Sequence, residues 1–442
     1  MGDTDEGFEM ARGLLAAGDV PGLLRYLRAD GVLLPLEAVA SLVAGVGRLV
    51  GCDDLVQTAA AVADGGDGSG AEDVKALYDF GCECVDHEIG YLAVGPLARA
   101  LVLAPDAPQV LGELVTALEQ DGQHARAVSV LEEHASVTGW VHRCQYVYNA
   151  LMAGSPEKAR EGFRQLTVPV DAAWIPARER VRHMLARAAV ARAAGPLDYQ
   201  NLRGWHYTLT GGVLACLSPH GFHRGMTGRW GFLADSQQEC AFALRRLRLV
   251  LDAAGAVPEH VALLPDRSSR ILGLAAAAVL GLPAADFNPY KLAARSLVVA
   301  YNLNAADPDA VAALRWRAPG QVLFERATCW THPPRVAADV SGLLGQTVLA
   351  PWDGQWCILD DGNVGQGPGD DRPVEVIAAE LARTEPERDE GDGTAPADPD
   401  DGLRRFVQAV TTEDARDRDG GWLGGLREHV PNAGPVPSSR LI

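Results

Sequence analysis

The feature that most constrains the fold of this chain is a change in the spacing of its apolar residues near Gly195. From Glu9 to about Gly195, apolar residues recur every three or four positions and Gly or Pro marks short turns, which is typical of successive amphipathic helices. After Gly195, short β-branched runs alternate with helical stretches. The sequence therefore predicts an all-helical region followed by an α/β region.

The second region is predicted to contain alternating strands and helices. We expect strands at residues 260–265, 295–303 and 320–330, separated by helices at 269–283 and 307–317. A helix before them should begin at the N-cap Ser236 and end at Gly255. Such alternation predicts parallel βαβ units with right-handed crossovers.

Two further segments are assigned by their residue types. Residues 205–236 are rich in β-branched and aromatic residues and in glycine, which favours strand and loop over helix. Residues 335–348, "RVAADVSGLLGQTV", favour a last helix.

We expect three regions along the chain. A helical repeat domain should span 1–195, and an α/β domain with a mainly parallel sheet should span 196–377. An acidic linker and C-terminal tail should span 378–442, and its last residues look irregular and are expected to be mobile unless they dock on the body.

The helical region contains an internal repeat. A small residue followed four positions later by a large one recurs after 34 and then 32 residues, as Ala93 and Leu97, Ala127 and Leu131, Ala159 and Phe163. Together with the turn glycines at 122 and 154, this pattern resembles the tetratricopeptide repeat over about residues 90–167. The resemblance implies an array that holds a protein or peptide partner; the alternative is that the helices only support the following domain.

Composition excludes several classes of function. A net charge of −19 opposes binding to nucleic acid, and basic runs with interleaved aromatic residues are absent from the sequence. The acidic N-terminus is unlike a signal peptide, and the longest apolar runs are too short to cross a bilayer. The eight cysteines show no disulfide spacing. We therefore expect a cytoplasmic protein, of bacterial origin by its Ala, Gly, Arg and Asp content, with neither nucleic acid nor membrane as a partner.

A polar turn follows the first of the predicted parallel strands. It consists of Asp266, Arg267, Ser268 and Ser269, and it precedes an alanine-rich helix. Ligands of open α/β sheets bind beyond the carboxyl ends of the strands, where a helix N-terminus faces an anion. Asn302 and Asn304 follow the next strand and are expected to complete the same crevice. The turn is a candidate phosphate site, or simply the corner of a βα unit.

The order of these elements over residues 258–330 resembles the core of type I phosphoribosyltransferases. That family ends its second strand with two adjacent acidic residues and follows them with a Thr- and Gly-rich phosphate loop. Here the corresponding place reads Tyr301-Asn302-Leu303-Asn304, without the acidic pair and without the loop. The resemblance therefore supports a fold more than it supports transferase activity.

A second candidate site is the segment from Trp205 to Ser236, where basic and glycine residues gather. It is predicted to lie over the α/β crevice as a loop and to offer an anionic ligand its histidines and arginines, namely His206, His220, His223, Arg224 and Arg229. A zinc site would need converging ligands at a spacing that Cys216 and these histidines do not provide. Cys329 and His332 form a conceivable nucleophile pair, but no orienting Asn or Asp accompanies them. We expect no metal and no cofactor.

Two functions of different classes remain open. In the first, the chain is an adaptor or scaffold whose helical array binds a protein or peptide, while the α/β domain binds a small anionic ligand or is purely structural. In the second, it is an enzyme, most simply a transferase, that acts on a phosphorylated or peptidyl substrate between residues 205–236 and the strand ends near Asp266 and Asn302. Convergence of these polar side chains on one pocket would favour the second.

Overall fold

The fold was analysed in a computed structural model of the chain. The structure describes residues 2–65, 70–217, 228–358, 364–386, 398–412, 422–438 and 440. These residues form two compact units, and the boundary between the units lies between Arg178 and Glu179. The first unit is helical and the second contains a parallel sheet with helices, so the chain combines an α unit with an α/β unit.

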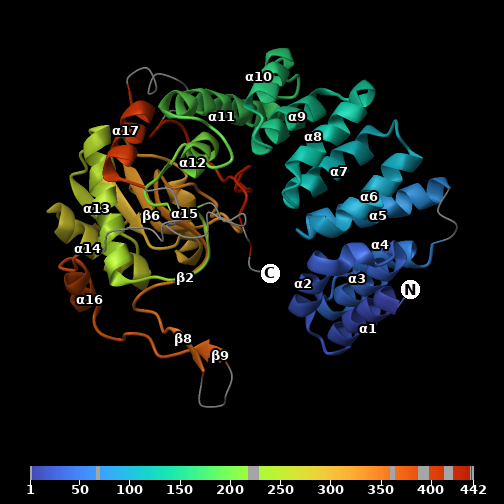
Figure 1. The fold of residues 1–442 in the computed structure, drawn as a ribbon, viewed down its shortest axis with the longest axis horizontal. Coiled ribbons are helices and arrows are strands. Elements are labelled where there is room, and N and C mark those ends of the chain that lie inside the picture. Colours follow the sequence, from blue (N-terminus) through green and yellow to red (C-terminus); the bar gives the residue numbers. More distant parts are fainter. Residues whose placement is uncertain are drawn as a thin grey trace. The chain divides into compact units, whose positions relative to one another are not determined.

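Helices of the first unit follow one another as antiparallel neighbours joined by short turns (Figure 1). Their bounds are α1 Gly2–Ala16, α2 Val20–Asp30, α3 Leu36–Val50, α4 Asp53–Ala63, α5 Ala71–Asp86, α6 Gly90–Leu103, α7 Pro108–Gln120, α8 His124–Glu133, α9 Trp140–Met152 and α10 Pro156–Gln165. The helix α11, Ile175–Ala194, contains the boundary between the two units.

The turns and the packing of these helices share a regular geometry. A residue with positive φ ends the first helix of five successive pairs, in the order Gly18, Gly51, Glu88, Gly122 and Gly154. The alanines at 93, 127 and 159 lie in the second helices of three pairs, and all three have no exposed surface. A methyl side chain at these points lets the paired helices approach closely.

The second unit is built on one seven-stranded sheet. Every pair of neighbouring strands in it is parallel within the described residues, and the order is β1-β7-β6-β5-β3-β4, with β2 also paired to β7. The bounds are β1 Val213–Leu214, β2 Trp230–Ala234, β3 His260–Leu263, β4 Ala284–Asp286, β5 Ser296–Ala300, β6 Val322–Cys329 and β7 Val340–Leu349. The strands β8 Trp356–Ile358 and β9 Val364–Gln366 form a separate antiparallel hairpin.

Helices cover both faces of this sheet. On one face lie α13 (Gln237–Ala254) and α14 (Arg267–Leu280), with α17 (Asp400–Val410) against the first and α16 (Val374–Leu381) against the second (Figure 1). On the other face lies α15 (Pro308–Leu314) with the segment that joins β6 to β7. Every residue of β5 is therefore buried, as expected for a parallel strand with two covered faces.

The structure confirms the predicted parallel strands β3, β5 and β6 and the helix α13. The Ser236 hydroxyl accepts a hydrogen bond from the Glu239 amide at 3.1 Å, and Glu239 completes a capping box. Gly255 ends the same helix with φ +63°. Cap chemistry in the sequence was thus sufficient to place both ends of this element.

The predicted helix at 335–348 is wrong, because most of that segment forms the strand β7. Its apolar residues face covered surfaces on both sides, so they do not alternate with polar residues, and such a run cannot be separated from a buried helix by periodicity. A Cβ at Gly342 would lie 2.5 Å from the Arg326 carbonyl oxygen of the neighbouring strand. Gly342 therefore allows the two strands to approach closely, and it does not end a helix.

The expectation of strand and loop at 205–236 is wrong at its beginning, where the helix α12 runs from Leu202 to Thr210. Asn201 caps this helix by accepting from the Gly204 amide at 2.8 Å. The hydroxyls of Thr208 and Thr210 donate to carbonyl oxygens four residues earlier, at 2.8 and 2.7 Å. The Asn201 cap and the burial of residues 202–209 thus outweigh the β propensity of the segment.

None of the helices among the described residues is both long enough and apolar enough to span a bilayer.

Candidate functional site

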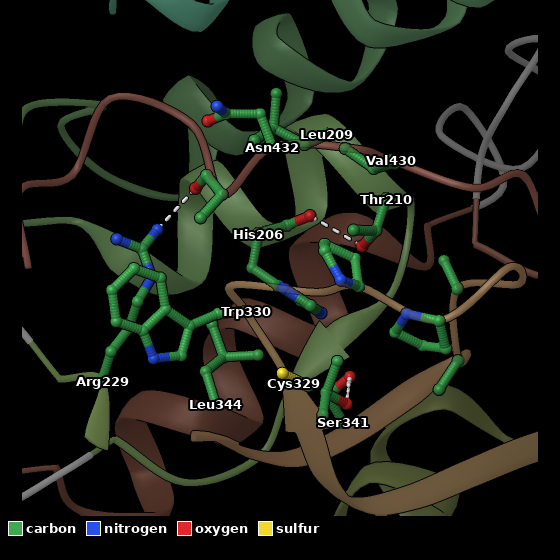
Figure 2. A pocket seen from close by; sticks show the side chains of 16 residues that line it. His206, Leu209, Thr210, Arg229, Cys329, Trp330, Ser341, Leu344, Val430 and Asn432 are labelled. Atoms are coloured by element: carbon green, nitrogen blue, oxygen red, sulfur yellow. Dashed lines mark hydrogen bonds between the residues drawn. The ribbon is translucent and has the colours of Figure 1, made fainter. Parts of the chain in front are cut away.

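An apolar cavity lies in the α/β unit at the carboxyl end of β6. Its walls come from α12, from Arg229 just before β2, from β6, β7 and the β6–β7 connection, and from the C-terminal segment, which we define as residues 422–438 (Figure 2). Its volume, measured over the positions that the centre of a water molecule can take, is about 50 Å³. The lining side chains are His206, Leu209, Thr210, Arg229, Thr328, Cys329, Trp330, Pro333, Pro334, Ala337, Ala338, Ser341, Leu344, Val430, Asn432 and Ala433.

His206 is a polar group at the centre of this cavity. The helix α12 holds it with 8% of its surface exposed, and its ring points toward Cys329 and Ser341 (Figure 2). Burial, and then the nearby Arg229 guanidinium, lower the pKa of His206 to about 3. Its Nε2 has no hydrogen-bond partner in the described parts of the chain. The imidazole is therefore neutral at physiological pH and has one ring nitrogen available to a ligand.

Arg229 supplies a buried positive charge to the same cavity. It is 2% exposed, and burial lowers its pKa to about 9, so the guanidinium stays charged at neutral pH. Its terminal nitrogens donate to the carbonyl oxygens of Val436 and Ala433, each at 2.5 Å, and to the Ser438 hydroxyl at 3.0 Å. Across the described ranges, its Nε has no partner and no carboxylate forms an ion pair with it.

The hydroxyls of Thr328 and Ser341 and the thiol of Cys329 complete the polar part of the lining. Thr328 donates to the buried Glu325 carboxyl at 2.6 Å, and its oxygen lies 3.0 Å from the Ser341 hydroxyl. Burial raises the pKa of Glu325 to about 7. The Cys329 thiol donates to the Gln346 carbonyl oxygen at 3.4 Å. The His332 amide, rather than its ring, donates to that sulfur at 3.4 Å, so these two residues do not form a nucleophile and base pair.

The C-terminal segment closes one side of the cavity. Arg427 is buried and donates to the Asp339 carboxylate at 2.8 and 3.1 Å, and His429 lies 2.8 Å from the Pro334 carbonyl oxygen. Val436 is buried with Trp205 and Leu344 in a small core cluster. These residues dock on the α/β unit and supply part of the site, a role that their sequence did not indicate.

The turn at residues 266–269 is held by contacts within the protein. The Asp266 carboxylate caps α14 by accepting from the Ser269 amide at 2.9 Å. The Ser269 hydroxyl accepts from the Tyr301 amide at 2.9 Å, and the Ser268 hydroxyl accepts from the Trp352 indole at 2.8 Å. Arg267 donates to two backbone carbonyl oxygens of the segment 370–372. The hydroxyls and the guanidinium therefore already have protein partners.

A different polar depression covers this turn. Arg267, Trp352 and Asp353 line it together with glycines 354, 367 and 369 and with Asp370 and Asp371. The Trp352 ring meets the Tyr301 ring edge-on at 5.5 Å between centroids, beside the carboxyl end of β5. The point between β3 and β5, where strand order reverses and α/β ligands commonly bind, is thus occupied by aromatic side chains.

The remaining predicted site residues lie elsewhere. Asn302 accepts from the Asn304 amide at 2.9 Å, and the Asn304 side chain donates to the His332 carbonyl oxygen at 2.7 Å, which ties the loop after β5 to the β6–β7 connection. Cys216 is buried. His220, His223 and Arg224 lie outside the described residues. Of the predicted set, the structure brings His206 and Arg229 into one cavity and places Arg267 in another depression.

A buried charge network at the carboxyl ends of the strands escaped the sequence reasoning. Arg326 donates to both oxygens of Asp235, at 2.6 and 3.1 Å, and the Tyr301 hydroxyl donates to Asp235 at 2.8 Å. The Cys240 thiol donates to the same carboxylate at 3.2 Å. These residues come from four separate elements, so their spacing in the sequence carries no signal. One hint was available, since Glu325 and Arg326 are two charged residues inside a buried strand.

Comparisons of the chain with protein-family models, with curated proteins and with solved structures found no match.

Proposed function

We propose that the protein is an adaptor in which the helical unit binds a protein or peptide partner and the α/β unit binds a small ligand in the cavity around His206. One observation carries the ligand-binding half. Two polar atoms, His206 Nε2 and Arg229 Nε, line the same apolar cavity without a hydrogen-bond partner in the described chain. Buried polar atoms in native proteins are nearly always bonded, so such a pair indicates a missing partner.

The geometry of the cavity agrees with small-molecule binding. Its volume of about 50 Å³, against ~10–15 Å³ for one water molecule, admits a molecule of a few non-hydrogen atoms. Most of the lining side chains are apolar, and a few polar side chains, among them His206 and Arg229, lie between them. Such a site excludes water and orients a ligand by a small number of hydrogen bonds.

The adaptor half of the proposal rests on the helical unit. The antiparallel helix pairs, the recurring left-handed turn residues and the buried alanines at 93, 127 and 159 support the resemblance to tetratricopeptide repeats. In such arrays each pair contacts its neighbours, and the exposed helix faces are available to an extended partner.

The geometry favours ligand binding over phosphoribosyl transfer. A transferase of that type would use the strand ends at Asp266 and Asn302. The hydroxyls of the 266–269 turn are bonded to Tyr301 and Trp352, and these two rings fill the crevice. We therefore place the ligand site at His206 and treat the turn as a structural corner.

Thermal melting of the full chain with a panel of small molecules tests the ligand half. The panel contains acids, alcohols, amines and amides of similar size. Ala338→Leu fills the cavity from its wall, and Ala284→Leu makes the same change at an exposed position of β4. Compounds that raise the Tm of the wild type should lose their effect in Ala338→Leu and keep it in Ala284→Leu. Equal effects in all three proteins would place binding elsewhere and contradict the proposal.

A peptide experiment tests the adaptor half. Peptides selected from a display library against the full chain are added at saturating concentration, and amide hydrogen exchange is followed by mass spectrometry. We expect protection in α2 to α10. Protection confined to residues 179–438 would contradict an adaptor role for the helical unit.

A further inference from the structure

The charges around the cavity restrict the class of ligand that it accepts. Arg229 is buried against the face of Trp330, with 5.5 Å between its guanidinium carbon and the ring centroid. The guanidinium of Arg440 lies over the same ring at 5.9 Å. Among the described residues, the cavity lining contains no carboxylate. A buried cation without an anionic partner is costly, so the site is electrostatically complementary to a negative group.

The number of free donors restricts the size of that negative group. Three of the five N–H groups of Arg229 already donate to the C-terminal segment, which leaves the N–H at Nε and one N–H at Nη2 for a ligand. A phosphate dianion needs several donors and a polar surround, whereas this lining is mostly apolar. The two oxygens of one carboxylate match these two charge-assisted donors.

The rest of the lining selects the body of the ligand. Leu209, Leu344 and Val430 are aliphatic, and Pro333, Pro334 and Ala338 are apolar. Burying an alkyl chain against them is favourable by about 25 cal/mol per Å² of apolar surface. His206 Nε2 offers one further polar contact, which as a neutral imidazole either donates or accepts according to its tautomer.

From this arrangement we infer that the cavity binds a small monocarboxylate with an aliphatic body, its carboxylate on Arg229 and its alkyl chain against Leu209, Leu344 and Val430. The inference rests on the proposed ligand-binding function and names the ligand class of that site. A neutral alcohol of equal length fills the same space without using the buried charge, and an amine opposes that charge.

Calorimetric titration of the full chain with straight-chain carboxylates from acetate to decanoate tests this inference. The matched primary alcohols and amines are titrated in parallel. We expect affinity to peak at a short chain length, because the cavity volume is only about 50 Å³, and we expect the best acid to bind at least tenfold more tightly than the alcohol of the same length. The amine should not bind. Because this comparison uses the wild-type protein, it stands even where a variant fails to fold.

Substitutions of Arg229 provide a second test of the monocarboxylate inference. Arg229→Gln removes the charge together with the bonds to the C-terminal segment, so it should weaken the best acid at least tenfold more than it weakens the alcohol of the same length. Arg229→Lys, which keeps the charge without Nε, should fall between. Arg267→Gln removes an arginine of the other depression and is the matched control, with no expected change.

The outcomes separate this inference from the proposed function. If alcohols or amides bind as tightly as acids and Ala338→Leu abolishes their binding, the cavity is a ligand site but the monocarboxylate class is wrong. If acids bind equally well to Arg229→Gln and to Ala338→Leu, they bind elsewhere and the inference fails. If no compound of the panel binds, both the inference and the proposed ligand site fail.

Discussion

At the scale of single residues, the buried ionisable groups of the α/β unit govern how its stability responds to pH. His206 has a folded-state pKa of about 3, against an ordinary value of 6.5. Between these values the unfolded state binds a proton that the folded state does not. Stability therefore falls as the pH decreases through 6.5, and this loss is complete near pH 3.

Replacing His206 by Leu should remove that contribution. Between pH 7.5 and pH 5 the wild type should lose ~2 kcal/mol relative to His206→Leu, since 1.36 kcal/mol corresponds to one pH unit below the unfolded pKa. Urea unfolding at several pH values measures the difference, and other buried carboxyl groups cancel because both proteins contain them. Parallel pH profiles for the two proteins would show that His206 is protonated in the folded state.

The Asp235–Arg326 pair is a second residue-scale test. Both side chains are nearly inaccessible to solvent, and Asp235 also accepts from Tyr301 and Cys240. Asp235→Asn leaves the Arg326 charge buried without compensation, which should lower the free energy of unfolding by about 3–5 kcal/mol. The exposed pair Arg270–Asp286, at 2.8 Å, is the control, and Asp286→Asn should cost under about 1 kcal/mol. Urea unfolding measures both variants, and similar losses of unfolding free energy would contradict the distinction between the buried pair and the exposed pair.

At the scale of elements, the turns of the helical unit contain one residue that departs from its equivalents. Glu88 has φ +59°, whereas glycine takes the corresponding left-handed position at 18, 51, 122 and 154. Side chains with a Cβ pay roughly 1 kcal/mol for this conformation. Glu88→Gly should therefore raise the free energy of unfolding by about 1 kcal/mol, and Gly122→Ala should lower it by a similar amount. Thermal unfolding measures both, and a destabilising Glu88→Gly would refute the argument.

Elements differ in how far the sequence alone could place them. The helix α13 was predictable because Ser236, Glu239 and Gly255 specify its ends by local hydrogen bonds and by a left-handed residue. The strand β7 was not, because its burial on both faces and the close approach at Gly342 depend on strands distant in the sequence. Hydrogen bonds at the ends of a helix can therefore be predicted from one segment of the sequence, whereas contacts between distant strands cannot.

The candidate site follows the same division. His206 and Arg229 were marked by residue type in a segment dense with glycine and basic residues, and the structure brings them to one cavity. The opposite wall, at Val430, Asn432 and Ala433, comes from residues that had no distinguishing pattern. Their position depends on Arg427 and Arg229 binding carboxylate and carbonyl groups across the unit.

At the scale of the whole molecule, the chain consists of two compact units that differ in architecture. The helical unit repeats one simple packing arrangement, and the α/β unit encloses a cavity with a buried, uncompensated charge. Under the proposed function, a ligand that binds only the folded α/β unit stabilises that unit by mass action, so the supply of the ligand governs the stability of the unit.

Native mass spectrometry of the full chain, purified under gentle conditions from its own host, tests the central claim most directly. We expect the wild type to retain the mass of a small molecule, and we expect Ala338→Leu, with its cavity filled, to show the mass of the polypeptide alone. Ala284→Leu should behave as the wild type does. The same retained mass in all three proteins, or a bare polypeptide in all three, would contradict the assignment of the cavity around His206 as a ligand site.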